Sequence, residues 1–190
     1  MRKIVSKYKE DRKRKRNQLI VGFVLIFIMF FSVLGYSLGG RDTTEDSNKI
    51  NYNGFEFENQ NGFWVLNMEN FNFIFRYNPE QVEKSYSLIN PLNNYYQKPL
   101  YVSSENIEAE REIYINLQQI ALRMQSACLE GEECGNENWP VKTCADNFII
   151  IREDNSSHIT QNENCVFIKG AQENLTRITD EFLFKILGVE

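Results

Sequence analysis

The sequence predicts an α+β domain that follows an N-terminal transmembrane helix. Three observations lead to this prediction: a long uncharged apolar run near the N-terminus, short aromatic-rich runs separated by turn signals, and two later stretches with apolar residues at helical spacing. We expect a mostly antiparallel sheet, with elements in the order β-β-β and then β-α-β-β-α, and two amphipathic helices packed on it.

Charge is distributed unevenly along the 190 residues. Residues 1–17 contain nine lysines and arginines but only two acidic residues, so we predict that they form a basic cytosolic tail beside the membrane. The chain from residue 41 onward contains 12 basic and 24 acidic residues. This balance argues against nucleic acid as a partner, because nucleic-acid binding needs a cationic surface.

The apolar run extends from Leu19 to Leu38 and contains no ionisable group except the phenol of Tyr36. Twenty helical residues match the roughly 30 Å hydrocarbon core of a lipid bilayer. We therefore predict that residues 18–38 form a transmembrane signal-anchor helix. Two alternatives stay open: a signal peptide cleaved near the small residues at 35–39, and a type IV pilin-like leader.

The polar residues 39–50 are predicted to be a linker, and an extracytoplasmic α+β domain is expected over residues 51–190. Three aromatic-rich runs, divided by Asn61-Gly62 and Glu69-Asn70, predict an antiparallel meander. The runs are Tyr52–Glu58, Gly62–Asn67 and Phe71–Tyr77. The alternating phenylalanines of the third run could form a carbohydrate-stacking platform, but a sheet needs a packed face, so we assign them to the core.

A less regular stretch from Pro79 leads to a short predicted strand, Leu100–Ser103, and then to a helix with Ser104 as its N-cap. The apolar residues of this helix lie on one stripe: Ile107, Ile113, Leu117, Ile120, Met124 and Cys128. Glu108, Glu110 and Glu112 lie mostly off the stripe, which predicts a solvated face rather than an acid/base or metal site.

Two apolar strands, Phe148–Ile151 and Cys165–Ile168, are predicted to form a hairpin that turns near Asp154-Asn155. We expect the strand at residues 100–103 to pair in parallel with the strand at 148–151, because a helix connects them. A final amphipathic helix ends at Gly188. Its apolar residues are Leu175, Ile178, Phe182, Leu183, Ile186 and Leu187.

The four cysteines, Cys128, Cys134, Cys144 and Cys165, all follow the predicted span. An even number in an oxidising compartment predicts two disulfides. In the predicted hairpin Cys144 lies opposite Cys165, which leaves Cys128 to pair with Cys134. A zinc site is the alternative, but the spacing contains no C-x-x-C pair.

Two sequons make Asn155 and Asn174 candidate glycosylation sites. No catalytic, cofactor-binding or metal-binding motif is present, and the single histidine, His158, follows a predicted turn. The leading hypothesis is a membrane-anchored extracytoplasmic binding or scaffold module whose partner is another envelope protein or a surface polymer. The alternatives are a membrane-tethered enzyme that uses carboxylates, and a subunit of a larger membrane complex.

Overall fold

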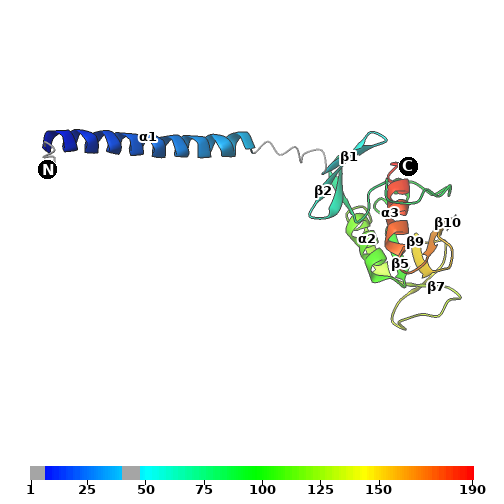
Figure 1. Cartoon of the computed structure of the whole chain (residues 1–190). Helices are drawn as coiled ribbons and strands as arrows, with labels where there is room; N and C mark the ends of the chain where they lie inside the picture. Colours follow the sequence, from blue (N-terminus) through cyan, green and yellow to red (C-terminus); the bar gives the residue numbers. More distant parts are fainter. Residues whose placement is uncertain (1–6, 40–47) are drawn as a thin grey trace. The chain divides into compact units, whose positions relative to one another are not determined.

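The computed structural model describes residues 7–39 and 48–190, and the side chains of its first helix from Arg14 to Phe31. The chain divides into two compact units, residues 1–45 and residues 46–190. Helix α1 (Lys7–Gly39) belongs to the first unit, and the second is a mixed α+β domain (Figure 1). Residues 1–6 of the predicted tail and 40–47 of the predicted linker lie outside the described residues.

Helix α1 contains the predicted apolar segment. Its large apolar side chains from Leu19 to Phe31 are exposed, with exposed fractions from 50% to 75%. Among the residues described, no helix has both the length and the apolar character needed to cross a membrane. The side chains of residues 32–38, the last part of the predicted span, lie outside the described residues.

Four antiparallel strands open the second unit: β1 (Lys49–Tyr52), β2 (Phe55–Gln60), β3 (Phe63–Met68) and β4 (Phe71–Phe75). The predicted meander is confirmed, with one more strand than expected. An additional turn at Asn53-Gly54 divides the first aromatic run, and both of its residues have positive φ, as a tight hairpin turn requires. Because β1 begins at Lys49, two residues of the predicted linker belong to this sheet.

A second sheet of five strands has the order β10-β11-β9-β5-β6. Its strands are β5 (Pro99–Ser104), β6 (Arg123–Ser126), β9 (Phe148–Glu153), β10 (His158–Asn162) and β11 (Cys165–Gly170). The predicted parallel pairing of β5 with β9 is confirmed, with Val102 opposite Ile149. The prediction of a mostly antiparallel sheet is wrong here, because only β10 and β11 pair in that sense.

The predicted hairpin between residues 148–151 and 165–168 is also wrong. Strands β9 and β11 are parallel, with Phe148 opposite Cys165, and β11 lies between β9 and β10. The prediction does not include β10, since this edge strand is mostly polar and buries only Ile159. The intervening strand reverses the chain, so that β11 can return parallel to β9.

Two helices belong to the second unit. Helix α2 (Ile107–Leu117) begins after Asn106, whose side-chain oxygen accepts hydrogen bonds from the backbone N–H groups of Glu108 and Ala109. The predicted cap, Ser104, instead ends β5. The predicted extension of this helix to Cys128 is wrong, because the chain leaves the helix after Leu117 and forms β6. The final helix, α3 (Leu175–Ile186), is confirmed.

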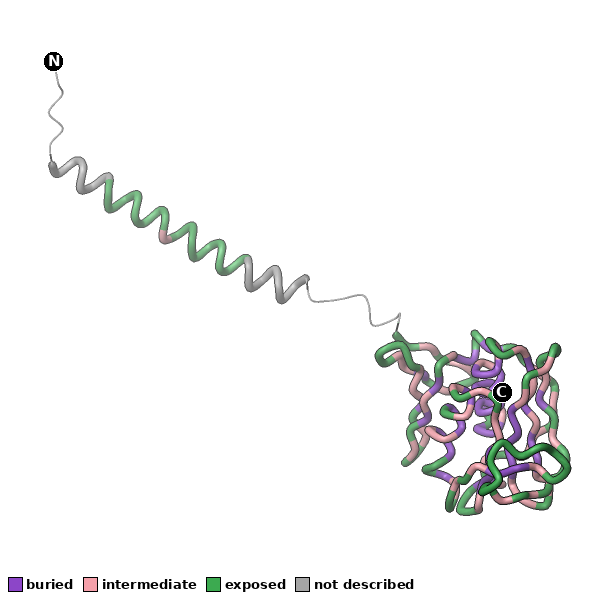
Figure 2. The backbone as a smooth tube through the Cα atoms, turned by 90° about the horizontal axis from the view of Figure 1, so that it is seen from below, coloured by how far each residue is buried: buried purple, intermediate pink, exposed green. Residues whose placement is uncertain are grey.

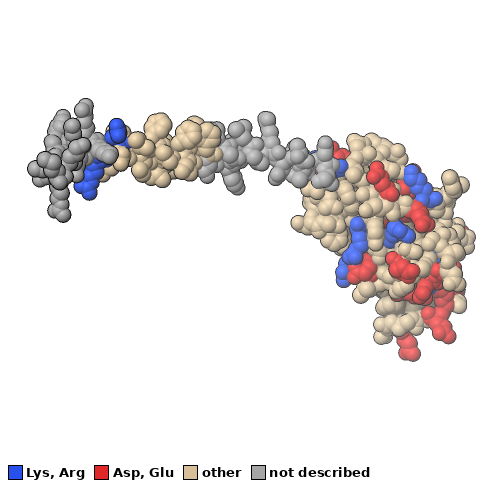
Figure 3. Space-filling view, viewed as in Figure 1, with Lys and Arg blue, Asp and Glu red and all other residues tan. Residues whose placement is uncertain are grey.

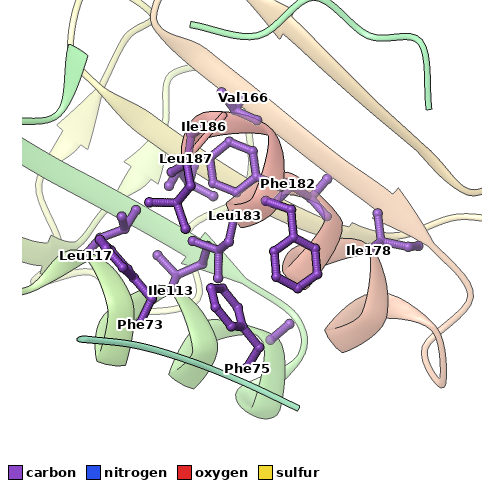
Figure 4. Close-up of a cluster of buried hydrophobic side chains, with 14 of the residues drawn as sticks. Phe73, Phe75, Ile113, Leu117, Val166, Ile178, Phe182, Leu183, Ile186 and Leu187 are labelled. Carbon is purple, nitrogen blue, oxygen red and sulfur yellow. The ribbon is translucent and has the colours of Figure 1, made fainter. Parts of the chain in front are cut away.

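Helices α2 and α3 lie between the two sheets, and both helices pack against both sheets (Figure 1, Figure 4). The core includes Phe57 and Phe75 from the first sheet, Phe184 from α3 and Val166 from β11. Buried residues are concentrated inside this arrangement, while the loops are exposed (Figure 2). The described domain is therefore a β/α/β sandwich of three layers.

Candidate binding site

The two disulfides pair as predicted: Cys128 with Cys134, and Cys144 with Cys165. Their Cα atoms are 5.4 and 4.9 Å apart, which is a normal separation for bridged cysteines. The reason given for the second pairing is wrong, however. Cys165 begins β11, while Cys144 lies in the loop before β9, and the backbone N–H of Asn164 donates to the carbonyl of Cys144.

The loop that carries the disulfides covers the outer face of the five-stranded sheet. There a second, smaller core contains Tyr101, Phe148 and Cys165. Arg152 links the loop to the sheet. Its guanidinium donates hydrogen bonds to the carbonyl and hydroxyl of Ser103 on β5, and it forms an ion pair with Glu132 of the loop at 2.5 Å. This loop includes the two-stranded parallel sheet of β7 (Cys128–Leu129) and β8 (Val141–Lys142).

Acidic side chains are concentrated at the end of the domain formed by the disulfide loop (Figure 3). Four exposed residues of this loop are acidic: Glu130, Glu132, Glu133 and Glu137. Among the described residues, no group of three or more histidines, cysteines or carboxylates is arranged to hold a metal ion.

Two carboxyl groups are buried where α2 meets α3. Glu112 is 5% exposed and Asp180 is fully buried, so the prediction that Glu112 belongs to a solvated face is wrong. Burial raises the pKa of Glu112 to about 7. Burial, followed by repulsion from Glu112, raises the pKa of Asp180 well above its ordinary value. The charge of Glu112 therefore favours the protonated form of Asp180.

Buried polar side chains of both helices form hydrogen bonds with the backbone groups along the free edge of strand β4 and just after its end. Asn116 accepts from the backbone N–H of Ile74 at 2.7 Å and donates to its carbonyl at 2.7 Å. Asp180 accepts from the backbone N–H groups of Arg76 and Tyr77 at 3.1 and 2.8 Å. These side chains replace a neighbouring strand. These hydrogen bonds give the buried side chains a structural role. Asp180 is fully buried, so a substrate cannot reach it.

An open groove of about 350 Å³ lies at the end of the β3–β4 hairpin, within the size range of ligand pockets. We call it the β3–β4 groove, and its lining residues are Met68, Glu69, Phe71, Phe73, Leu92, Asn93, Tyr96 and Ile120. Phe73 and Ile120 are buried and belong to the core beneath, whereas Tyr96 is 48% exposed. Apolar side chains thus form most of the lining, with one carboxylate and one amide at exposed positions.

Three separate segments build this groove. Strands β3 and β4 contribute Met68 and Phe71, the short 3₁₀-helix η1 (Leu92–Asn94) contributes Leu92, and the turn after α2 contributes Ile120. The assignment of the alternating phenylalanines to the core is confirmed for Phe73 and Phe75, which are buried, whereas Phe71 is half-buried in the groove. The sequence analysis did not predict the groove. The one sequence feature that could have indicated it is Phe71, the first residue of the alternating phenylalanines.

The other candidate residues lie apart from the groove. Asn155 is exposed in the turn between β9 and β10. Asn174 precedes α3, and its side chain accepts a hydrogen bond from Arg177 at 2.9 Å. His158 begins β10, and its ring nitrogen lies within hydrogen-bond distance of the hydroxyl and carbonyl oxygens of Ser156. Comparison with protein-family models, with curated proteins and with solved structures gives no match for this chain.

Proposed function

We propose that this chain is a membrane-tethered extracytoplasmic module that binds a partner through the β3–β4 groove. The apolar run from Leu19 to Leu38 and the basic residues before it support the tether and its orientation. The two disulfides support an oxidising compartment for the domain. The partner is another envelope protein or a surface polymer.

The groove is the observation that carries this proposal. It combines apolar walls with exposed polar positions at Glu69 and Asn93, an arrangement typical of sites that bind and orient a partner. An enzyme that uses carboxylates would need two of them open to the same space. In the described part of the chain, the groove has Glu69 as its only carboxylate, while Glu112 and Asp180 are buried in the helix interface.

Filling the groove should abolish partner binding. The variant Asn93→Trp places a large ring at an exposed lining position without removing a core side chain. Tagged full-length protein is purified from its native membrane, or incubated with isolated envelope polymer, and bound partners are quantified. We expect at least a tenfold loss of the partner relative to the wild type.

The matched control is Ile107→Trp, which introduces the same ring at a 71% exposed position outside the groove. This control should retain the partner. Equal recovery with Asn93→Trp, or no specific partner with the wild type, would overturn the proposal. Circular dichroism of both variants verifies that they are folded.

A further inference from the structure

Tyr86 and Leu88 project from the domain without covering any of it. They are 101% and 96% exposed, more than any other large apolar side chain described. Both lie on the segment between β4 and η1, where exposure alternates from Lys84 to Ile89. Alternation puts Lys84, Tyr86 and Leu88 on one side, with neighbours about 7 Å apart in an extended chain. We call these three side chains the Tyr86 ridge.

The inward side of the same segment is fastened to the domain. The backbone N–H of Ser85 donates to Glu181 at 2.6 Å, and that of Asn90 donates to the side chain of Gln161 at 2.7 Å. The hydroxyl of Ser87 donates to the carbonyl of Ile159 on β10. The ridge is therefore held outward by the hydrogen bonds of Ser85 and Ser87, which alternate with its residues, and the bond from Asn90 fixes the end of the segment. Two adjacent apolar side chains presented in this way are typical of a contact surface.

The β3–β4 groove of another molecule has the properties needed to accept the ridge. Its walls are apolar and aromatic, which suits Tyr86 and Leu88. Its one carboxylate, Glu69, is exposed at the rim, and the ridge carries one exposed ammonium, Lys84. That ammonium lies 5.1 Å from the centre of the Tyr52 ring, an exposed contact that an ion pair can replace.

We infer that the groove binds the Tyr86 ridge of a second copy of this chain. Tyr86 is fully exposed, so it does not occupy the groove of its own molecule. The ridge and the groove are different surfaces, and a contact between them joins copies head to tail and can extend into rows. The contact is small, so tethering in one bilayer would favour it by raising the local concentration. This inference rests on the proposed function of the groove and identifies the envelope protein that occupies it as another copy of this chain.

The test uses two full-length variants with different tags, each reconstituted in phospholipid vesicles and treated with a chemical cross-linker. The ridge variant carries Tyr86→Ser and Leu88→Ser, and the groove variant carries Asn93→Trp. Each variant alone should lose at least 90% of the cross-linked oligomers that the wild type forms. An equal mixture should recover dimers containing both tags, but no larger species, because one intact ridge meets one intact groove.

A charge exchange tests the ionic part of the contact. Lys84→Glu and Glu69→Lys should each reduce cross-linking severalfold, and a chain with both changes should regain it. Oligomers that persist in both single-surface variants, or a mixture that forms no dimers, would overturn the inference. If Asn93→Trp loses an envelope partner while self-association is unchanged, the proposed function stands and the second copy is not the occupant.

Discussion

Replacing Phe184 with alanine is expected to lower the free energy of unfolding of the domain by about 3–5 kcal/mol. The Phe184 side chain is fully buried, and its ring centre lies 4.5 Å from that of Phe75 and 5.7 Å from that of Phe57. It therefore joins α3 to the four-stranded sheet. The loss is a large part of the roughly 5–15 kcal/mol that stabilises a typical domain. Chemical denaturation followed by circular dichroism measures it.

Leu88→Ala is the matched control for Phe184→Ala. Leu88 is 96% exposed, so truncating it should change the free energy of unfolding by less than about 0.5 kcal/mol. Equal destabilisation by the two substitutions would contradict the position of Phe184 between α3 and the sheet.

Replacing Glu112 with glutamine is expected to stabilise the domain at alkaline pH and to flatten its dependence on pH. Glu112 has a folded-state pKa of about 7, above the ordinary value of 4.5, so the folded domain binds more protons than the unfolded chain between these values. Stability from this group is therefore complete below about pH 4.5 and is lost as the pH rises through 7. We expect a gain of about 1–3 kcal/mol at alkaline pH.

The control variant for Glu112→Gln is chosen among the charged groups that surround Glu112. Arg76 and Arg111 lower its pKa, whereas Glu108 raises it, and Asp180 faces it from α3. The same measurement on Glu108→Gln, a half-exposed position of α2, should retain a fall in the free energy of unfolding with rising pH. An unchanged pH dependence in Glu112→Gln would contradict the burial of this carboxyl group.

Local turn chemistry made the first sheet predictable. Asn61-Gly62 and Glu69 adopt the positive φ values that hairpins require, and the residue types indicated these turns. The same signal at Asn53-Gly54 lies inside an aromatic run, which concealed β1. The final helix was predictable for a similar reason, since its apolar stripe is long and continuous.

The end of α2, the burial of Glu112 and the groove depend on tertiary contacts, which the sequence pattern does not indicate. The apolar spacing of α2 continues through Ile120 and Met124, yet Met124 pairs beside Leu100 in the sheet instead of extending the helix. Glu112 has the pattern of a surface residue, yet it is buried on a helix that packs against both α3 and β4. The groove combines Phe71, Leu92 and Ile120 from distant segments, so no local pattern could reveal it.

Thiol labelling in intact cells tests most directly whether the disulfide-bonded domain lies outside the membrane. Cys134 is the reporter, because it is exposed and bonded to Cys128. We expect no labelling by a membrane-impermeant maleimide before reduction, and labelling after cells are treated with an impermeant phosphine reductant. A cysteine introduced in the predicted tail, Ser6→Cys, should react only after permeabilisation. Labelling of Cys134 only after permeabilisation would contradict an extracytoplasmic domain, and labelling in intact cells without reduction would contradict its disulfide with Cys128.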